Sequence, residues 1–111
     1  MKLNQILISG ALLFALVLLA LQVLAADAKG GKAMYDKRCS SCHGADGKGN
    51  PAMVKAMGEK GLNLTTKEVA GMKDDEVSKV ILEGRGKMPA TKGMTKDESK
   101  QVIDYVRTLQ K

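Results

Sequence analysis

The sequence is poor in side chains that stack or bind metals: it has no Trp, one Phe, two Tyr, one His and two Cys in 111 residues. So few aromatic side chains leave no platform for stacked bases, and the basic residues alternate with acidic ones, so we expect no nucleic-acid binding. Two Cys and one His also fall short of the four spaced ligands of a structural zinc site. From residue 27 onward no segment has the pattern of a strand, and we therefore predict an all-α fold.

Long apolar runs are confined to the N-terminus. Residues 1–5 carry one positive charge, residues 6–21 are almost continuously apolar, and Val23 and Ala25 stand at the −3 and −1 positions of a cleavage site. This layout predicts a secretory signal peptide, residues 1–25, cleaved after Ala25. The apolar run is also long enough to stay as a membrane anchor, and this alternative is open. No twin arginine and no cysteine accompany the signal, so we expect export of the unfolded chain without a lipid anchor.

Cleavage leaves residues 26–111 as a single domain of 86 residues. The loss of Lys2 leaves 17 basic side chains against 12 acidic ones, a net charge of +5. A domain of this size buries little surface on folding and usually needs a staple such as a disulfide, a metal or a cofactor. The composition thus favours a bound group before any motif is considered.

The most informative motif is Cys39-Ser40-Ser41-Cys42-His43, which has the C-x-x-C-H spacing of covalent c-type haem attachment. Residues three apart share a helix face, so each thiol can reach one vinyl group of the same haem. The imidazole that follows directly can then reach the iron as the proximal ligand. A catalytic dithiol is expected after a strand in a βαβ unit, and a disulfide closing so short a loop would constrain little of the unfolded chain. We therefore adopt haem attachment, with thiol redox chemistry as the alternative.

A methionine followed by proline marks the Gly-rich stretch 84–90. Pro89 biases Met88 toward an extended backbone, from which the thioether can point at a ligand, so we predict Met88 as the distal iron ligand. Met94, just before the last predicted helix, is its rival. The other internal methionines lie on or beside apolar helical faces, where methionine fills cores: Met34, Met53, Met57 and Met72.

The remaining patterns predict helices joined by loops. The first helix is expected to start at Asp27 and to end at Arg38, and the second to start at Asn50-Pro51 and to end at Gly58. The third is expected to start at Asp74 and to end at Gly84. The last starts with a Thr95/Glu98 capping box. Gly31 lies one turn before Tyr35, and Tyr105 stands on the last helix, so we expect the two ends of the chain to cross closely there. Pro51 has two interpretations: its carbonyl accepts from the outer nitrogen of His43, or it is merely structural.

These residues resemble the small class I monohaem c-type cytochromes of bacteria, the group of cytochromes c6, c555 and c551. The resemblance covers almost the whole chain after the presequence. It rests on Gly31 and Tyr35, on Cys39 to Gly44, on the loop to Pro51, on Lys87-Met88-Pro89-Ala90 and on Tyr105 to Leu109.

The resemblance implies the class I cytochrome c fold, in which crossed N- and C-terminal helices, short helices and loops enclose one covalent haem c. It implies that Cys39 and Cys42 form thioethers and that His43 and Met88 bind the iron. Thr91 departs from the pattern, because many relatives carry an aromatic residue in this segment. The haem is therefore expected to be less shielded there.

Two axial protein ligands leave no vacant iron position for oxygen or peroxide, and a thioether raises the potential. We therefore expect a periplasmic one-electron carrier between redox proteins, monomeric and not an enzyme. Two other functions stay open: peroxidase or ligand-sensing chemistry if Met88 is labile, and service as an electron-transfer subunit of a larger dehydrogenase.

Basic residues flank the loops expected around the haem edge, and they would steer the protein to acidic patches on its partners. They are Lys37, Arg38, Lys48, Lys55, Lys87 and Lys92. Solvated lysines that only aid solubility are the alternative. Arg85 is a candidate partner for a haem propionate, or else an exposed loop arginine.

Overall fold

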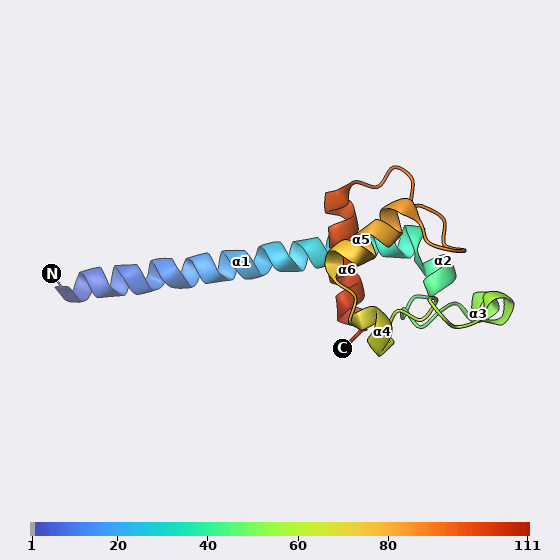
Figure 1. Ribbon diagram of the computed structural model, residues 1–111. Coiled ribbons are helices and arrows are strands. Elements are labelled where there is room, and N and C mark those ends of the chain that lie inside the picture. Colours follow the sequence, from blue (N-terminus) through green and yellow to red (C-terminus); the bar gives the residue numbers. More distant parts are fainter. Residues whose placement is uncertain (1) are drawn as a thin grey trace.

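The computed structural model describes residues 2–111, apart from the side chains of residues 23–28. Within this part of the chain the helices are α1 (Lys2–Arg38), α2 (Ser40–His43), α3 (Pro51–Met57), α4 (Lys67–Ala70), α5 (Asp74–Glu83) and α6 (Lys96–Leu109). No strand forms among these residues, which confirms the all-α prediction. Figure 1 shows the N-terminal part of α1 projecting from a cluster formed by the other helices, and the molecule measures 71 × 27 × 22 Å.

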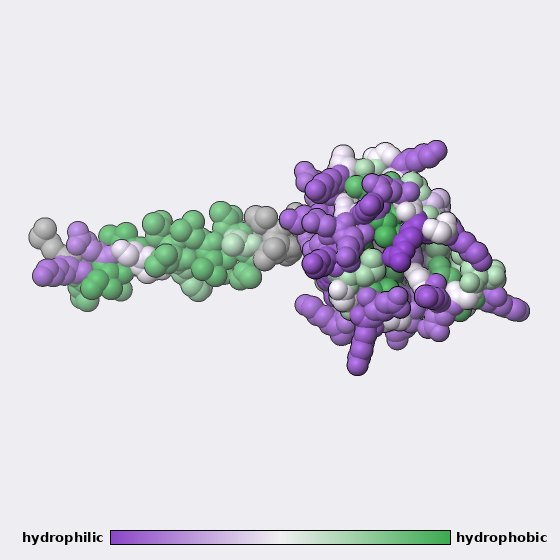
Figure 2. Space-filling view, in the orientation of Figure 1, coloured by the Kyte–Doolittle hydropathy of each residue, from purple (hydrophilic) through white to green (hydrophobic). Residues whose placement is uncertain are grey.

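The projecting part of α1 is apolar on all sides. Residues Lys2–Gln22 have a mean hydropathy of 2.2 and are exposed throughout, and they form the one helix of the described chain that is long and apolar enough to cross a membrane. Figure 2 shows this apolar surface beside a largely hydrophilic remainder. The expected helix start at Asp27 is wrong, because α1 runs uninterrupted from Lys2 to Arg38. The side chains of Asp27 and of the predicted cleavage residues Val23 and Ala25 lie outside the described ones.

The C-terminal end of α1 crosses α6, as predicted. A Cβ on Gly31 would overlap the backbone carbonyl of Gln101 and lie 3.2 Å from Cβ of Tyr105. The Tyr35 and Tyr105 rings meet beside this point with centroids 5.3 Å apart and planes tilted by 59°. The buried core around this crossing consists of Tyr35, Ile81, Val102, Ile103 and Val106. The absent side chain at Gly31 thus lets the two helix backbones approach closely.

Helix α6 begins with the predicted capping box. The Thr95 hydroxyl accepts from the Glu98 backbone N–H at 3.1 Å, and the Glu98 carboxylate accepts from the Thr95 N–H at 2.9 Å. The prediction for α5 is off by one residue: Asp74 is the first helical residue and Lys73 the cap, whose N–H donates to the Glu76 carboxylate at 3.2 Å. Asp74 is thereby left for a contact with α6.

Short helices and glycine turns connect these elements. The Asn50 side chain accepts from the Ala52 N–H at 3.0 Å and caps α3, with Pro51 at the first helical position as predicted. Gly84 ends α5 with φ of +80°, a backbone conformation that favours glycine. Helix α4 was not predicted, although Thr66 supplies a local signal, since its hydroxyl accepts from the Val69 N–H at 3.3 Å.

Candidate functional site

One large cavity lies between α5, α6, the end of α1 and the loops that follow α3 and α5. Its volume is about 650 Å³, within the range of about 300–1,000 Å³ that is typical of cofactor sites. The walls are mainly apolar, with Val69, Val77, Val80, Ile81, Ile103 and Val106 among the lining residues. A cavity of this size and character suits a flat apolar ligand.

The C-x-x-C-H motif enters the cavity at the junction of α1 and α2. Cys39 closes one helical turn, since its carbonyl accepts from the N–H groups of Cys42 at 3.2 Å and His43 at 3.0 Å. Cys39 and His43 line the cavity. Cys42 is half-buried and is not among the lining residues. The predicted helical turn between the two thiols is therefore present, with one thiol on the cavity wall.

No disulfide joins Cys39 and Cys42, and the surroundings of Cys39 do not favour a reactive thiol. Burial raises the pKa of the Cys39 thiol, and the Arg38 charge opposes this only in part. Nucleophilic cysteines need a lowered pKa instead, since the thiolate is the reactive form. The raised pKa of Cys39 therefore gives no support to dithiol redox chemistry at this motif.

The His43 ring is held by a backbone carbonyl. Its Nδ1 lies 3.0 Å from the Leu62 carbonyl oxygen, which can only accept, so Nδ1 carries the proton and donates. Of the two interpretations of Pro51, the structure supports the purely structural one: Pro51 begins α3, while the loop after α3 brings the Leu62 carbonyl to the ring. Nε2 is the ring nitrogen left for a metal, as in metal-binding histidines whose other nitrogen donates to a carbonyl.

The segment that carries Leu62 is joined to the loop after the motif. The Leu64 N–H donates to the Gly47 carbonyl at 2.7 Å. Gly49, at φ of +101°, packs so closely that a Cβ there would lie 2.8 Å from the Val54 side chain. Small residues in this loop therefore let the backbone close around His43.

Tyr35, on α1, forms a hydrogen bond to the residue that follows the C-x-x-C-H motif. Its hydroxyl donates to the Gly44 carbonyl at 2.6 Å, and its ring is fully buried. Burial is the main reason that the pKa of Tyr35 lies far above its ordinary value, so the hydroxyl keeps its proton and remains a donor. The first residue after the motif is thus anchored to α1.

Met88 lines the cavity from a tight turn. Backbone hydrogen bonds join Arg85 and Met88 in both directions, at 2.9 and 3.0 Å, around Gly86 and Lys87. The turn packs against Gly84, where a Cβ would lie 2.7 Å from the Met88 carbonyl oxygen. Met88 therefore has the non-helical backbone that was predicted for it.

Two methionines line the cavity, Met88 and Met72. Met94, the predicted rival, is not among the lining residues and packs against the buried core instead. Met72 was assigned to core filling from the sequence, but the turn before α5 carries it to the cavity wall. The structure therefore replaces Met94 by Met72 as the thioether to be tested beside Met88.

Charged side chains stand at the cavity rim. Lys60, Arg85 and Arg107 are the basic residues on its lining, and Glu59 and Glu68 are the acidic ones. Among the described residues, the side chains of Lys60 and Arg85 have neither hydrogen-bond nor ion-pair partners. Either can meet the anionic edge of a ligand, whereas sequence patterns had pointed to Arg85 alone.

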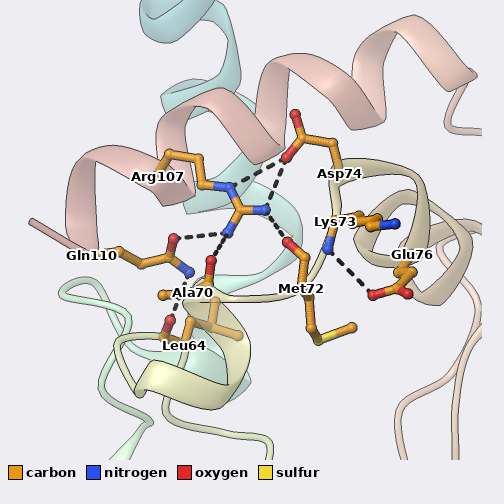
Figure 3. A network of polar contacts seen from close by, with 8 residues as sticks. All are labelled: Leu64, Ala70, Met72, Lys73, Asp74, Glu76, Arg107 and Gln110. Carbon is orange, nitrogen blue, oxygen red and sulfur yellow. Dashed lines mark hydrogen bonds and ion pairs between the residues drawn. The ribbon is translucent and has the colours of Figure 1, made fainter.

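Arg107 differs from these two because it is tied into a polar network (Figure 3). Its guanidinium contacts the Asp74 carboxylate at 2.9 Å, the Met72 carbonyl at 2.7 Å and the Ala70 carbonyl at 3.2 Å. Gln110 joins the same network. Sequence analysis assigned no role to Arg107 or Gln110, because most of their partners lie 33 or more residues away along the chain.

The donor set around the cavity fits one particular cofactor. A thiol, an imidazole with a free Nε2 and a thioether meet around an apolar cavity, which matches covalent haem with axial nitrogen and sulfur ligands. Among the described residues no group of three His, Cys, Asp or Glu side chains is placed to hold a metal ion by itself. The cavity thus suits a haem iron better than a bare ion.

Comparison with known proteins agrees with this geometry. The family model described as "Cytochrome C oxidase, cbb3-type, subunit III" matches residues 26–106. Cytochrome c-554(547) of Halothiobacillus neapolitanus is 30% identical over an alignment of 91 residues, and the match covers 77% of this chain and 99% of that protein.

A second relative is longer. The "Menaquinol:cytochrome c reductase cytochrome c subunit" of Bacillus subtilis (strain 168) is 33% identical over an alignment of 86 residues, and the match covers 75% of this chain. The match covers 28% of the Bacillus protein. Since the family model covers well over half of the chain, the protein belongs to the cytochrome c family of that model and is a monohaem c-type cytochrome domain.

Proposed function

We propose that this protein carries one covalent haem c, held by Cys39 and Cys42 with His43 and Met88 as axial ligands, and passes single electrons between redox proteins. The observation that supports this most directly is the meeting of Cys39, His43 and Met88 on one apolar cavity in a member of the cytochrome c family. Cytochromes c are generally electron carriers rather than enzymes.

Bound haem supplies one-electron chemistry between ferric and ferrous iron, at a potential set by its ligands. The protein's part is to hold the ligands still. His43 is oriented by the Leu62 carbonyl, and Met88 by the tight turn that it shares with Arg85. With His43 and Met88 held in this way, little atomic movement would accompany electron transfer at a bound haem, and the barrier to exchange would be low.

We propose export to the periplasm, with residues 1–25 as a signal peptide cleaved after Ala25 and residues 26–111 as the cytochrome domain. The apolar helix Lys2–Gln22 supports a signal or an anchor, and the family match begins at residue 26. Electron donors and acceptors with acidic docking surfaces would suit the exposed basic residues near the cavity mouth. Arg38 and Lys92 are two further exposed basic residues that lie together on the surface, since the Arg38 guanidinium donates to the Lys92 carbonyl at 2.7 Å.

A second candidate function is that of a bound cytochrome subunit in a membrane redox complex. The Bacillus relative is described as a subunit of a menaquinol:cytochrome c reductase, and the family model as an oxidase subunit. The apolar helix Lys2–Gln22, if retained, would hold the domain at the membrane. Both candidate functions use the same one-electron chemistry.

An optical spectrum and an intact mass of the exported protein test this proposal. The expected mass is that of residues 26–111 plus one covalent haem, and the expected spectrum is that of low-spin haem with His and Met ligands. A retained presequence in the mass would favour the anchored subunit. A colourless protein, or a reduced protein that binds carbon monoxide rapidly at neutral pH, would contradict the proposed carrier.

Three methionine variants test the distal ligand. Met88→Ala is expected to abolish the absorption band of the iron–thioether bond, because it removes the proposed ligand. Met94→Ala is expected to leave the band intact, and so is Met72→Ala, a matched loss of a thioether from the same cavity wall. Loss of the band in Met72→Ala, with its survival in Met88→Ala, would reassign the ligand to Met72.

A further inference from the structure

Arg107, in the last turn of α6, uses all five N–H donors of its guanidinium within the protein. Nε donates to the Asp74 carboxylate at 3.3 Å and one terminal nitrogen to the same oxygen at 2.9 Å. The remaining donors go to the carbonyls of Met72 at 2.7 Å and Ala70 at 3.2 Å and to Oε1 of Gln110 at 3.0 Å. Figure 3 shows these bonds converging on one side chain.

The pattern of partners points to a positioning role. An exposed ion pair contributes little by itself, and the Arg107 and Asp74 side chains are 28% and 56% exposed. Three of the five bonds go to neutral oxygens instead, and two of these are backbone carbonyls at the end of α4 and in the turn before α5. The planar guanidinium presents its N–H donors in fixed directions and can hold these backbone carbonyls in one place. A lysine ammonium does this less well, because its three donors rotate on a flexible side chain.

Gln110 extends the network toward the proximal histidine. Its Nε2 donates to the Leu64 carbonyl at 2.8 Å while its Oε1 is held by Arg107. Leu62, two residues before Leu64, supplies the carbonyl that accepts from Nδ1 of His43. The end of α6 is thus linked through two side chains to the short segment that orients the His43 ring.

We propose that Arg107 and Gln110 form a positioning pair that fixes segment 62–64 and, through the Leu62 carbonyl, sets the hydrogen bond of the His43 ring. The inference rests on the proposed function, because its consequence is a change in the His43–iron bond. Neither side chain touches the iron.

The sign of the effect separates this role from a simple charge effect. A hydrogen bond from Nδ1 makes the imidazole a more basic ligand, which favours ferric iron. Loosening segment 62–64 weakens that bond and therefore raises the reduction potential. Loss of a positive charge from the protein lowers the reduction potential instead, since it stabilises ferric iron, the more positively charged state. Variants that keep the charge therefore isolate the positioning role.

Two variants of the haem-bearing protein make the test. Arg107→Lys keeps the positive charge but loses the planar set of guanidinium donors. Gln110→Met keeps the length of the side chain and its neutrality but loses the hydrogen bonds to Arg107 and to the Leu64 carbonyl. Lys100→Met is the control: it removes a charge from an exposed position on the same helix. The readouts are the reduction potential, the urea midpoint, and the NMR position of the His43 Nδ1 proton in the ferrous state.

Both test variants are expected to raise the potential and to shift the Nδ1 proton upfield, and Lys100→Met to leave the proton unmoved. Wild-type values of both quantities in Gln110→Met would overturn the inference, even if Arg107→Lys failed to fold. A fall in urea midpoint with an unmoved Nδ1 proton would overturn it as well, because it would show a purely structural role. A wild-type chain without covalent haem would instead overturn the proposed function on which the inference rests.

Discussion

Tyr35 combines packing and hydrogen bonding in one side chain. The ring is fully buried against Tyr105, and the hydroxyl donates to the Gly44 carbonyl at 2.6 Å. That carbonyl also accepts from the Gly47 N–H at 3.2 Å, so it keeps one partner when the hydroxyl is removed. Tyr35 thereby joins the core of the helix crossing to the start of the loop around His43.

We predict that Tyr35→Phe lowers the free energy of unfolding by about 1 kcal/mol, the usual net value of one such bond. Urea titration of the exported protein measures it. Tyr105→Phe is the matched control, because no described residue hydrogen-bonds to its hydroxyl, and a smaller loss is expected there. Equal losses in the two variants would show that the bond to Gly44 contributes nothing.

The same variant has a predicted pH dependence. Burial is the largest cause that raises the pKa of Tyr35 in the folded protein, while the unfolded chain keeps the ordinary value of about 10. The contribution of Tyr35 is therefore complete below about pH 10 and falls as the pH rises further, because the unfolded chain releases the proton first. The difference in unfolding free energy between wild type and Tyr35→Phe is expected to shrink between neutral pH and about pH 11. An unchanged difference would contradict the raised pKa.

At the level of elements, the crossing of α1 and α6 depends on one of two adjacent glycines. A Cβ at Gly31 would overlap the Gln101 backbone, which cannot move without shifting α6. A Cβ at Gly30 would lie 3.2 Å from the end of the Gln101 side chain, which can rotate away. The two positions therefore differ in packing although they share a helix and a residue type.

We predict that Gly31→Ala destabilises the protein by about 1–3 kcal/mol, the usual cost of overpacking. Gly30→Ala is expected to be neutral or to stabilise by up to about 1 kcal/mol, since alanine is the better helix former. Urea midpoints of the two variants measure the difference. Similar midpoints would mean that the helices do not cross as closely as described.

Elements also differ in how far the sequence could predict them. The Thr95/Glu98 box and the Asn50-Pro51 start are formed by side chains within three residues of the backbone groups they bind, and both predictions are confirmed. Asp74 was misplaced by one residue because acidic residues suit both the cap and the first turn. Local signals thus placed these three helix starts to within a residue, whereas the start expected at Asp27 was wrong because α1 runs uninterrupted from Lys2.

On the scale of the whole molecule, charge and apolar surface are separated. The apolar helix Lys2–Gln22 projects from a domain whose visible face is largely hydrophilic (Figures 1 and 2). The full chain has a net charge of +6, and Lys2 is the only charged residue among residues 1–25. The rest of the chain, residues 26–111, is therefore basic whether or not the apolar N-terminal segment is retained.

We predict that this charge governs the encounter with small redox reagents. Oxidation of the reduced protein by an anionic reagent such as ferricyanide is expected to slow as salt is added, because screening removes the attraction. Oxidation by a cationic cobalt complex is expected to speed up under the same conditions. Stopped-flow rates at several salt concentrations measure both trends. Rates that do not change with salt concentration would indicate that the lysines are solvated and do not steer the encounter.

By itself the sequence determined the features carried by neighbouring residues: the C-x-x-C-H turn, the capped helices, the apolar N-terminal run and the unusual Met88-Pro89 pair. These depend on contacts across a few residues, which the order of side chains specifies directly. The family membership predicted from them is confirmed by the match over residues 26–106.

Only the tertiary structure decided which carbonyl orients His43, which methionines share the cavity, and what Arg107 holds. Every residue has a carbonyl, so nothing in the sequence distinguishes Leu62 from Pro51 as the acceptor. Met72 and Asp74 lie 35 and 33 residues before Arg107 and meet it only after α5 has packed on α6. Contacts over such separations form because the apolar faces of the helices pack together, and that packing brings polar groups to places that no local pattern records.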